Sequence, residues 1–335
     1  MSTGTAPGAA PLRLGTRASL LARTQSGTVA DAVRAATGRE VELVPITTDG
    51  DVLTGPLAQL GGTGVFVAAL RDALLRGECD FVVHSMKDLP TGAVDGLTIG
   101  AVPHRAPVRD VLCSRDGSPL DALPHGAVVG SGSPRRVAQL LRRRPDLVVR
   151  GIRGNVDTRL RKVDEGEYDA IVLAEAGLTR IGRTDRISER FDADGWPPSA
   201  GQGALAVEVR TGVEGDDSAA VRDAVARITD ADAEVTALLE RAVLRRLEAG
   251  CAAPVGIAAT LEAEAGADAD ADADRVALVA EVYALDGARA VRVTHDLARA
   301  EVADDAGRAA AAERVVADLL ARGAGELADL AGSGR

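Results

Sequence analysis

Residues 80–90 read Asp80-Phe-Val-Val-His-Ser-Met-Lys-Asp-Leu-Pro90. The run of Phe and Val predicts a short buried strand. Polar residues follow it at once, and Pro90 ends the segment because proline lacks the N–H that a helix needs. Ligands of α/β sheets collect just beyond the carboxyl ends of strands. Lys87 and Asp88, a cation beside a carboxylate at such an end, are therefore candidate site residues, and the alternative is a surface ion pair in a loop.

Composition limits the class of protein. The chain has 335 residues, of which 46% are hydrophobic and 27% charged, so we expect a globular protein of two or three domains. Aromatic residues make up 2% and the formal net charge is −11, which disfavours a nucleic-acid or membrane-surface partner. No apolar run approaches ~20 residues, and the N-terminus lacks a signal-peptide pattern. We therefore expect a cytoplasmic protein.

The basic residues and cysteines are unusual in kind and spacing. Only two of the 39 basic residues are lysines, Lys87 and Lys162. Because an ammonium and a guanidinium group are not interchangeable, the lysine at position 87 hints at a specific role. The cysteines at 79, 113 and 251 are three in number and far apart, which favours neither a disulfide framework nor a zinc site. We expect no metal.

The first part of the chain predicts an α/β lobe. A strand from Leu12 leads to Ser19, which is placed to cap a helix that Gly38 ends. Arg17 lies at the amino end of this helix, where backbone N–H groups favour anions. Segment 49–64 is rich in Gly, Asp and Thr but lacks the ending of a phosphate-binding loop, so we expect a mobile lid. Further expected elements are strands at 41–46 and 97–102 and a helix at 66–76.

A second unit begins near residue 104 and contains a cluster of arginines between residues 135 and 159, although the whole chain is net acidic. Small residues at the mouth of a helix, followed by paired arginines, form an anion-binding loop at 130–136. Guanidinium groups in such loops suit carboxylates or phosphates. The alternative to anion binding is a basic helix face exposed to solvent, and we interpret the arginines at 142–144 in this way. The candidate binding residues here are Ser131, Ser133, Arg135, Arg136, Arg153 and Arg159. The strands expected around them lie at 111–114, 128–129, 147–149 and 168–174.

The chain then returns and builds a smaller domain. An irregular Pro/Gly segment, 195–203, carries Gln202, and the strand expected at 204–210 can rejoin the first sheet. Two α/β lobes would then flank a cleft in which the groups near 88 and 131–159 face one another. The last third predicts an α+β domain. Its expected elements are helices at 232–249 and 303–322, a strand at 255–261 and a hairpin across Asp286-Gly287.

Eight stretches together resemble the porphobilinogen deaminase family. They occur in the order of the family and span nearly the whole chain. They are GTRAS (15–19), GGTGVF (61–66), HSMKDLP (84–90), SGSPRR (131–136), RGNVDTRL (153–160), GEYDAIVLAEAGL (166–178), GQGA (201–204) and EAGCAAPVG (248–256).

The resemblance implies a fold of two periplasmic-binding-protein-like lobes with a small C-terminal domain that carries the cofactor cysteine. The domains would be 1–103 with 204–226, then 104–203, then 227–335. It implies a monomeric transferase that adds four porphobilinogen molecules, each losing ammonia, to a dipyrromethane cofactor and releases hydroxymethylbilane.

The resemblance also implies roles for individual residues. Cys251 would hold the dipyrromethane through a thioether, and Asp88 would be the catalytic aspartate, stabilising positive charge on a pyrrole nitrogen. The expected cofactor contacts are Lys87, Ser131, Ser133, Arg135 and Arg136. The expected substrate contacts are Arg17, Ser19, Arg153, Arg159 and Gln202. Two positions depart from the family pattern, Thr63 and Gly132, and we assign them no binding role.

Two other classes of function remain open at this point. A two-lobed anion-binding protein without catalysis would share the fold, although a third domain and a cysteine in a loop argue against it. Alternatively, Lys87 could form a Schiff base or Cys251 could be an acyl-transfer nucleophile. His84 is the one histidine of four that falls near the expected cleft, so a Cys–His pair has little support.

Overall fold

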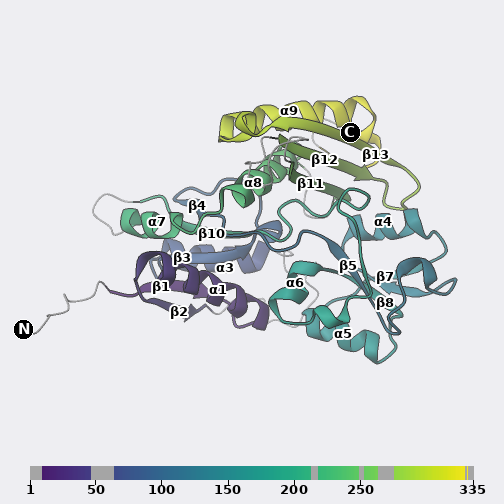
Figure 1. Cartoon of the computed structure of the whole chain (residues 1–335), viewed down its shortest axis with the longest axis horizontal. Coiled ribbons are helices and arrows are strands. Elements are labelled where there is room, and N and C mark those ends of the chain that lie inside the picture. The colour runs from purple at the N-terminus through teal and green to yellow at the C-terminus, as the bar shows by residue number, and fades with distance from the viewer. Residues whose placement is uncertain are drawn as a thin grey trace, which may run out of the picture. The chain divides into compact units, whose positions relative to one another are not determined.

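The computed structural model describes residues 10–46, 64–212, 218–248, 253–262, 275–328 and 330, without the side chains of 64–66 (Figure 1). The chain divides into two compact units. The first unit comprises Met1–His104 and Leu205–Ala231, and the second comprises Arg105–Ala204 and Asp232–Arg335. The expected lid and Cys251 lie outside the described residues.

The first unit contains a five-stranded sheet in the order β2-β1-β3-β10-β4. Strands β1, β2 and β3 are parallel, whereas β10 runs antiparallel between β3 and β4. The strand expected at 204–210 therefore does rejoin the first sheet. The strands are β1 (Leu12–Thr16), β2 (Val41–Pro45), β3 (Phe81–Ser85), β4 (Leu97–Ala101) and β10 (Leu205–Arg210). The helices are α1 (Leu20–Thr37), α3 (Gly64–Leu75) and α7 (Ser218–Ala226).

Alternating side chains of this sheet enter two separate cores. Phe81 and Val83 of β3 pack with residues of α1 and α7, whereas Val82 packs with residues of α3. Helix α1 begins and ends where its sequence predicts: Ser19 caps its N-terminus, and Gly38 has a φ of 70° at its C-terminus. The helix expected at 66–76 begins two residues earlier.

The second unit contains a sheet of the same topology, in the order β7-β6-β8-β5-β9. Strand β6 is parallel to β7 and β8, and β5 runs antiparallel to β8. The strands are β5 (Asp110–Ser114), β6 (Val128–Gly130), β7 (Val148–Arg150), β8 (Ala170–Ala174) and β9 (Glu189–Arg190). The helices are α4 (Pro134–Arg143), α5 (Val156–Asp164) and α6 (Glu175–Arg180). The chain passes between the units just before β5 and just before β10. Strand β10 is antiparallel to β3, which precedes Lys87 and Asp88, and β5 is antiparallel to β8, which is parallel to β6 before the 131–136 loop.

The second unit also contains the smaller C-terminal domain. Its three-stranded antiparallel sheet packs against two helices through a core of aliphatic residues. The predicted Asp286-Gly287 turn is confirmed, with Gly287 at a φ of 73°. The elements are α8 (Ala231–Arg246), β11 (Val255–Glu262), β12 (Arg275–Tyr283), β13 (Ala290–Ala298) and α9 (Asp305–Ala321). Short 3-10 turns occur at Met86–Asp88, Leu120–Ala122, Thr184–Arg186, Arg299–Val302 and Ala324–Glu326.

Glu240 of α8 joins this domain to the segment that carries Gln202. One carboxylate oxygen accepts hydrogen bonds from Arg105 Nη2 and from the N–H of Gly201, both at 2.7 Å, and the other accepts from the N–H of Ala259 at 2.8 Å. Arg105 also donates from Nε to the carbonyl of Gln202 at 3.0 Å. Glu240 is 1% exposed, so one buried carboxylate ties together a helix, a sheet and the chain crossing.

We predict that Glu240→Ala lowers the free energy of unfolding by about 3–5 kcal/mol, because it leaves a buried guanidinium and two backbone N–H groups without their acceptor. Urea denaturation measures the loss. Glu313→Ala is the control, because Glu313 pairs with Arg246 at the exposed surface and should cost much less. Equal losses of unfolding free energy in the two variants would contradict the stabilising role of the buried Glu240 carboxylate.

Candidate active site

The turn after β3 holds Lys87 and Asp88 between two buried apolar residues, Met86 and Leu89. Met86 is 0% exposed and Leu89 3% exposed, and the N–H of Leu89 donates to the carbonyl of Met86 at 3.1 Å. Lys87 and Asp88, within the 3-10 turn, are half-buried. The strand predicted at 81–83 extends through Ser85, so the turn starts directly from the sheet edge.

Ser19 caps the N-terminus of α1, as the sequence predicts. Ser19 accepts a hydrogen bond from the N–H of Ala22 at 3.4 Å, and the first turn contains no acidic residue. Arg17, which precedes the cap, is half-buried. The positive end of the helix dipole and a guanidinium group therefore lie in one short segment.

In the second lobe, the paired arginines lie around one carboxylate, that of Asp110 at the start of β5. Asp110 Oδ1 accepts hydrogen bonds from Arg136 Nη2 at 2.6 Å and from Gln202 Nε2 at 2.8 Å. Asp110 Oδ2 accepts from Arg135 Nη1 at 2.8 Å and from Trp196 Nε1 at 3.2 Å. We call these five residues the Asp110 cluster. All five are buried, so Arg135, Arg136 and Gln202 are parts of a core as well as predicted ligands.

The Asp110 cluster has an excess of positive charge. Burial opposes ionisation of Asp110, but Arg135 and Arg136 outweigh it and hold the pKa of this carboxyl well below its usual range. Two guanidinium groups thus face one carboxylate, and their remaining hydrogen-bond partners are neutral. Among the described residues, the buried Nε atoms of both arginines have no hydrogen-bond acceptor. A cluster with one surplus cation and two unused donors suits an anion.

The loop before α4 adds further donors. Ser133 is the N-cap of α4 but makes no side-chain capping bond, and its own N–H donates to Ser131 Oγ at 3.2 Å. The first turn of this ten-residue helix therefore has no side-chain cap, and the binding of an anion there stays a prediction. A Cβ on Gly132 would lie 3.1 Å from the carbonyl oxygen of Ile152, which is a physical reason for glycine at this position.

The remaining predicted arginines of this lobe lie around the start of α5. Arg153 is exposed, and Arg159 donates from Nε to the carbonyl of Gly154 at 2.8 Å. Asn155 caps the helix by accepting from the N–H of Thr158 at 2.9 Å. Gln202, by contrast, is 0% exposed and donates from Nε2 to the carbonyl of Val108 at 2.7 Å as well as to Asp110. The contact of Gln202 with substrate stays a prediction.

Sequence reasoning missed two members of this region. Asp110 could have been found as the lone acid leading an apolar strand, where a buried carboxylate needs partners. Arg180 donates to the carbonyl of Gly203 at 2.6 Å, and burial lowers its pKa to about 10. No carboxylate pairs with Arg180 in the described ranges 10–46, 64–212, 218–248, 253–262 and 275–328. It is therefore a further cation next to the Gln202 segment.

Cys79 and Cys113 are core residues. Cys79 and Cys113 are both 0% exposed, and burial raises the pKa of their thiols to about 11 and about 12. Neither thiol is suited to nucleophilic chemistry near neutral pH. Within the part of the chain that the structure describes, no His/Cys/Asp/Glu group could hold a metal ion.

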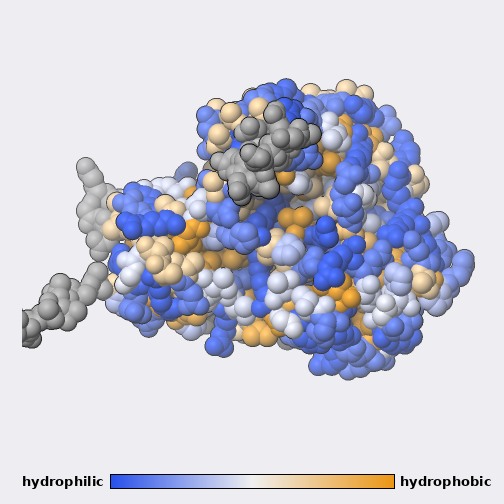
Figure 2. Space-filling model, viewed as in Figure 1, coloured by the Kyte–Doolittle hydropathy of each residue, from blue (hydrophilic) through white to orange (hydrophobic). Residues whose placement is uncertain are grey.

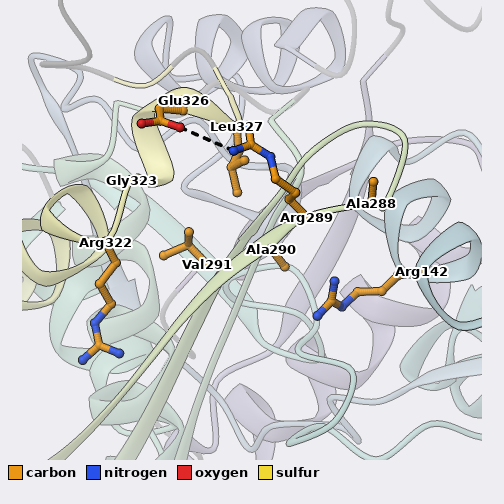
Figure 3. Close-up of a pocket in the computed structure, with 9 residues that line it drawn as sticks. All are labelled: Arg142, Ala288, Arg289, Ala290, Val291, Arg322, Gly323, Glu326 and Leu327. Carbon is orange, nitrogen blue, oxygen red and sulfur yellow. Dashed lines mark hydrogen bonds and ion pairs between the residues drawn. The ribbon is translucent and has the colours of Figure 1, made fainter.

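A shallow pocket of about 370 Å³ in the second unit is separate from the predicted residues (Figure 3). Three arginines line it, but Arg289 lies 3.4 Å from Glu326, and Arg322 donates to Asp318 at 2.7 Å. We therefore assign the pocket no ligand. Hydrophobic residues on the face drawn in Figure 2 gather in small groups among hydrophilic ones. None of the helices described here is long and apolar enough to cross a membrane.

Two family models match the chain. The model described as "Porphobilinogen deaminase, dipyromethane cofactor binding domain" matches residues 12–218, and "Porphobilinogen deaminase, C-terminal domain" matches residues 234–314. The chain belongs to the porphobilinogen deaminase family. The porphobilinogen deaminase of Leifsonia xyli is 51% identical over 325 residues, covering 96% of this chain and 95% of the relative. That of Thermobifida fusca is 49% identical over 326 residues, covering 97% and 98%.

Similar solved structures include binding proteins. The methionine binding protein MetQ has a TM-score of 0.41 at 13% identity and covers 65% of this chain and 89% of its own. A periplasmic substrate-binding protein from Coxiella burnetii has a TM-score of 0.40 at 13% identity and covers 65% and 91%.

Family membership gives the reaction. The protein is a transferase of tetrapyrrole biosynthesis that condenses four porphobilinogen molecules, with loss of ammonia, onto a dipyrromethane and releases hydroxymethylbilane. Each ring of the dipyrromethane has an acetate and a propionate. The surplus cation and unused Nε donors of the Asp110 cluster, with the open N-terminus of α4, fit such a polyanion.

We predict that Asp110→Asn lowers the free energy of unfolding by about 3–5 kcal/mol at pH 7, because it leaves two buried guanidinium groups uncompensated. The folded-state pKa of Asp110 is depressed, so its stabilisation is complete above the unfolded-state pKa and falls as the pH drops below it. The difference between parent and variant should therefore shrink below about pH 4, by about 1.4 kcal/mol per pH unit.

Denaturation at pH 7, 4 and 3 measures this difference. Asp121→Asn is the control, because Asp121 pairs with Arg143 at a more exposed position and should show a smaller effect. A difference that stays constant down to pH 3 would contradict the charged state assigned to Asp110.

Proposed function

We propose that Asp88 is the catalytic carboxylate of this reaction and that Cys251 is the attachment point of the dipyrromethane. The observation that supports the proposal is the Asp110 cluster, in which two buried arginines at the start of α4 share the carboxylate of Asp110 on β5. A net-acidic protein that keeps a surplus cation inside a lobe has a use for an anion there, and the carboxylates of linked pyrroles are such anions.

Asp88 has the chemistry and the exposure for the catalytic role. It follows β3 on a turn anchored by buried Met86, and it is half-buried, so part of its surface is accessible to a ligand. Loss of ammonia from the substrate leaves positive charge on the pyrrole nitrogen. A carboxylate beside that nitrogen stabilises the charge and can then accept the proton that leaves when the new bond has formed.

The cationic and hydroxyl residues divide into two groups in this proposal. Lys87, Ser131, Ser133, Arg135 and Arg136 hold the carboxylates of the dipyrromethane, which supplies the pyrrole carbon that is extended. Arg17, Ser19, Arg153, Arg159 and Gln202 hold those of the incoming substrate. Arg136 is better placed than Arg135 to touch a ligand directly, because its side chain is 9% exposed against 3%.

The proposal also includes the domain organisation, the oligomeric state and the location of the protein. The domain limits 1–103 with 204–226, 104–203 and 227–335 rest on the resemblance and the three sheets. The facing of the two groups across a cleft stays a prediction. Monomeric state and cytoplasmic location also stay predictions, which sedimentation and cell fractionation test.

We predict that Asp88→Asn lowers kcat by about two to four orders of magnitude, because the amide can neither balance the pyrrole charge nor accept a proton. Turnover of porphobilinogen and the intact mass of the variant are measured together. The mass should equal that of the parent with the expected change in side chain, so that the cofactor is retained. Asp95→Asn, an exposed aspartate of the same lobe, is the control and should keep parental turnover. Near-parental turnover in Asp88→Asn would end the assignment.

A further inference from the structure

A second buried acid lies behind the turn that carries Asp88. Glu208 of β10 is 3% exposed and lies between β3 and α3. Arg71 of α3 donates to it from Nε at 3.1 and 3.0 Å and from Nη2 at 2.8 Å. His84 Nε2 lies 3.2 Å from Glu208 Oε2. The catalytic and binding roles proposed above involve none of these three residues.

The chemistry of Glu208 decides the direction of the bond to His84. Burial opposes ionisation of Glu208, but hydrogen bonds from His84 and Arg71 outweigh it and lower the pKa of this carboxyl below its usual value. An ionised carboxylate only accepts hydrogen bonds. The proton between the two atoms therefore belongs to His84 Nε2, which in a neutral imidazole is the Nε2–H tautomer.

His84 lies in β3 two residues before the Met86–Asp88 turn, which carries Lys87 and Asp88. Ala206 pairs with His84 and Glu208 with Val82 across the two strands, so His84 and Glu208 lie on the same face of the sheet. The next residue, Ser85, accepts a hydrogen bond from Gln25 Nε2 of α1 at 2.8 Å on the opposite face. The last two residues of β3 are thus fixed by side chains from both faces, directly before the Met86–Asp88 turn.

We propose that Glu208 is a positioning residue that acts through His84: by holding the Nε2–H tautomer, it fixes the carboxyl end of β3 and thereby the orientation of Lys87 and Asp88. The proposal rests on the catalytic role proposed for Asp88. Arg71 serves it by neutralising and orienting the carboxylate. A structural residue alone would affect stability, whereas a positioning residue affects kcat more than KM.

The test compares two double variants, R71M/E208Q and R71M/E208L. Both remove the buried charge pair as a whole, so neither leaves an unpaired charge. Gln keeps a carbonyl oxygen for His84 Nε2–H, and Leu does not. We expect kcat of the Leu variant to be about tenfold to a hundredfold below that of the Gln variant, with KM changed much less. Equal kcat in two folded variants would overturn the proposal.

A spectroscopic readout tests the same bond independently of activity. The chain contains four histidines, so ring ¹⁵N shifts of His84 can be assigned by comparison with His84→Gln. We expect the Nε2–H tautomer in the parent and in R71M/E208Q, and its loss in R71M/E208L. The Nδ1–H tautomer in the parent would also overturn the proposal.

If R71M/E208L does not fold, a second pair, H84Q and H84L, replaces it, because both keep the Arg71–Glu208 ion pair. The Gln amide can donate where Nε2–H did, so H84L should have a kcat about tenfold or more below H84Q. Equal values would contradict the proposal. An active Asp88→Asn variant would instead refute the catalytic assignment while leaving the tautomer result intact, so the two failures are distinguishable.

Discussion

One buried carboxylate, that of Asp110, determines the character of the second lobe. Its two oxygens bind the guanidinium groups of Arg135 and Arg136, and none of the three charges could stay buried without the others. Gln202 and Trp196 complete the shell and bring the chain crossing to the same point. Because one carboxylate faces two cations, a positive charge remains at the start of α4. The anion binding proposed for this lobe would therefore depend on its core as well as on its surface.

The first lobe contains a comparable arrangement. Glu208 is a buried acid on β10, as Asp110 is on β5, and each strand is antiparallel to its neighbour in an otherwise parallel part of the sheet. Both strands adjoin a point where the chain passes from one unit to the other. In each lobe an acid on the crossing strand thus binds arginine and lies close to predicted site residues. Glu240 gives the same crossing a third buried acceptor, on α8.

The sequence predicts features that depend on adjacent residues, and it does not predict contacts between residues that are far apart in the chain. The cap at Ser19, the turn at Gly287 and the strand before Asp88 each depend on a few adjacent residues. The Asp110 cluster does not, because Asp110 and Arg136 are 26 residues apart and meet only when β5 and α4 pack together. The sequence therefore predicts cations near 135 but not that they share a buried carboxylate. The same limit hides Glu208, whose partners come from α3 and β3.

The most direct test of the account is the intact mass of the purified protein beside that of Cys251→Ser, with Cys113→Ala as the matched control for a buried cysteine. The account predicts that the parent and Cys113→Ala are both heavier than their bare chains by two linked pyrrole units. It predicts that Cys251→Ser has the mass of its bare chain. An adduct that survives in Cys251→Ser would place the attachment elsewhere. A bare parent that gains no mass on incubation with porphobilinogen would contradict the covalent cofactor altogether.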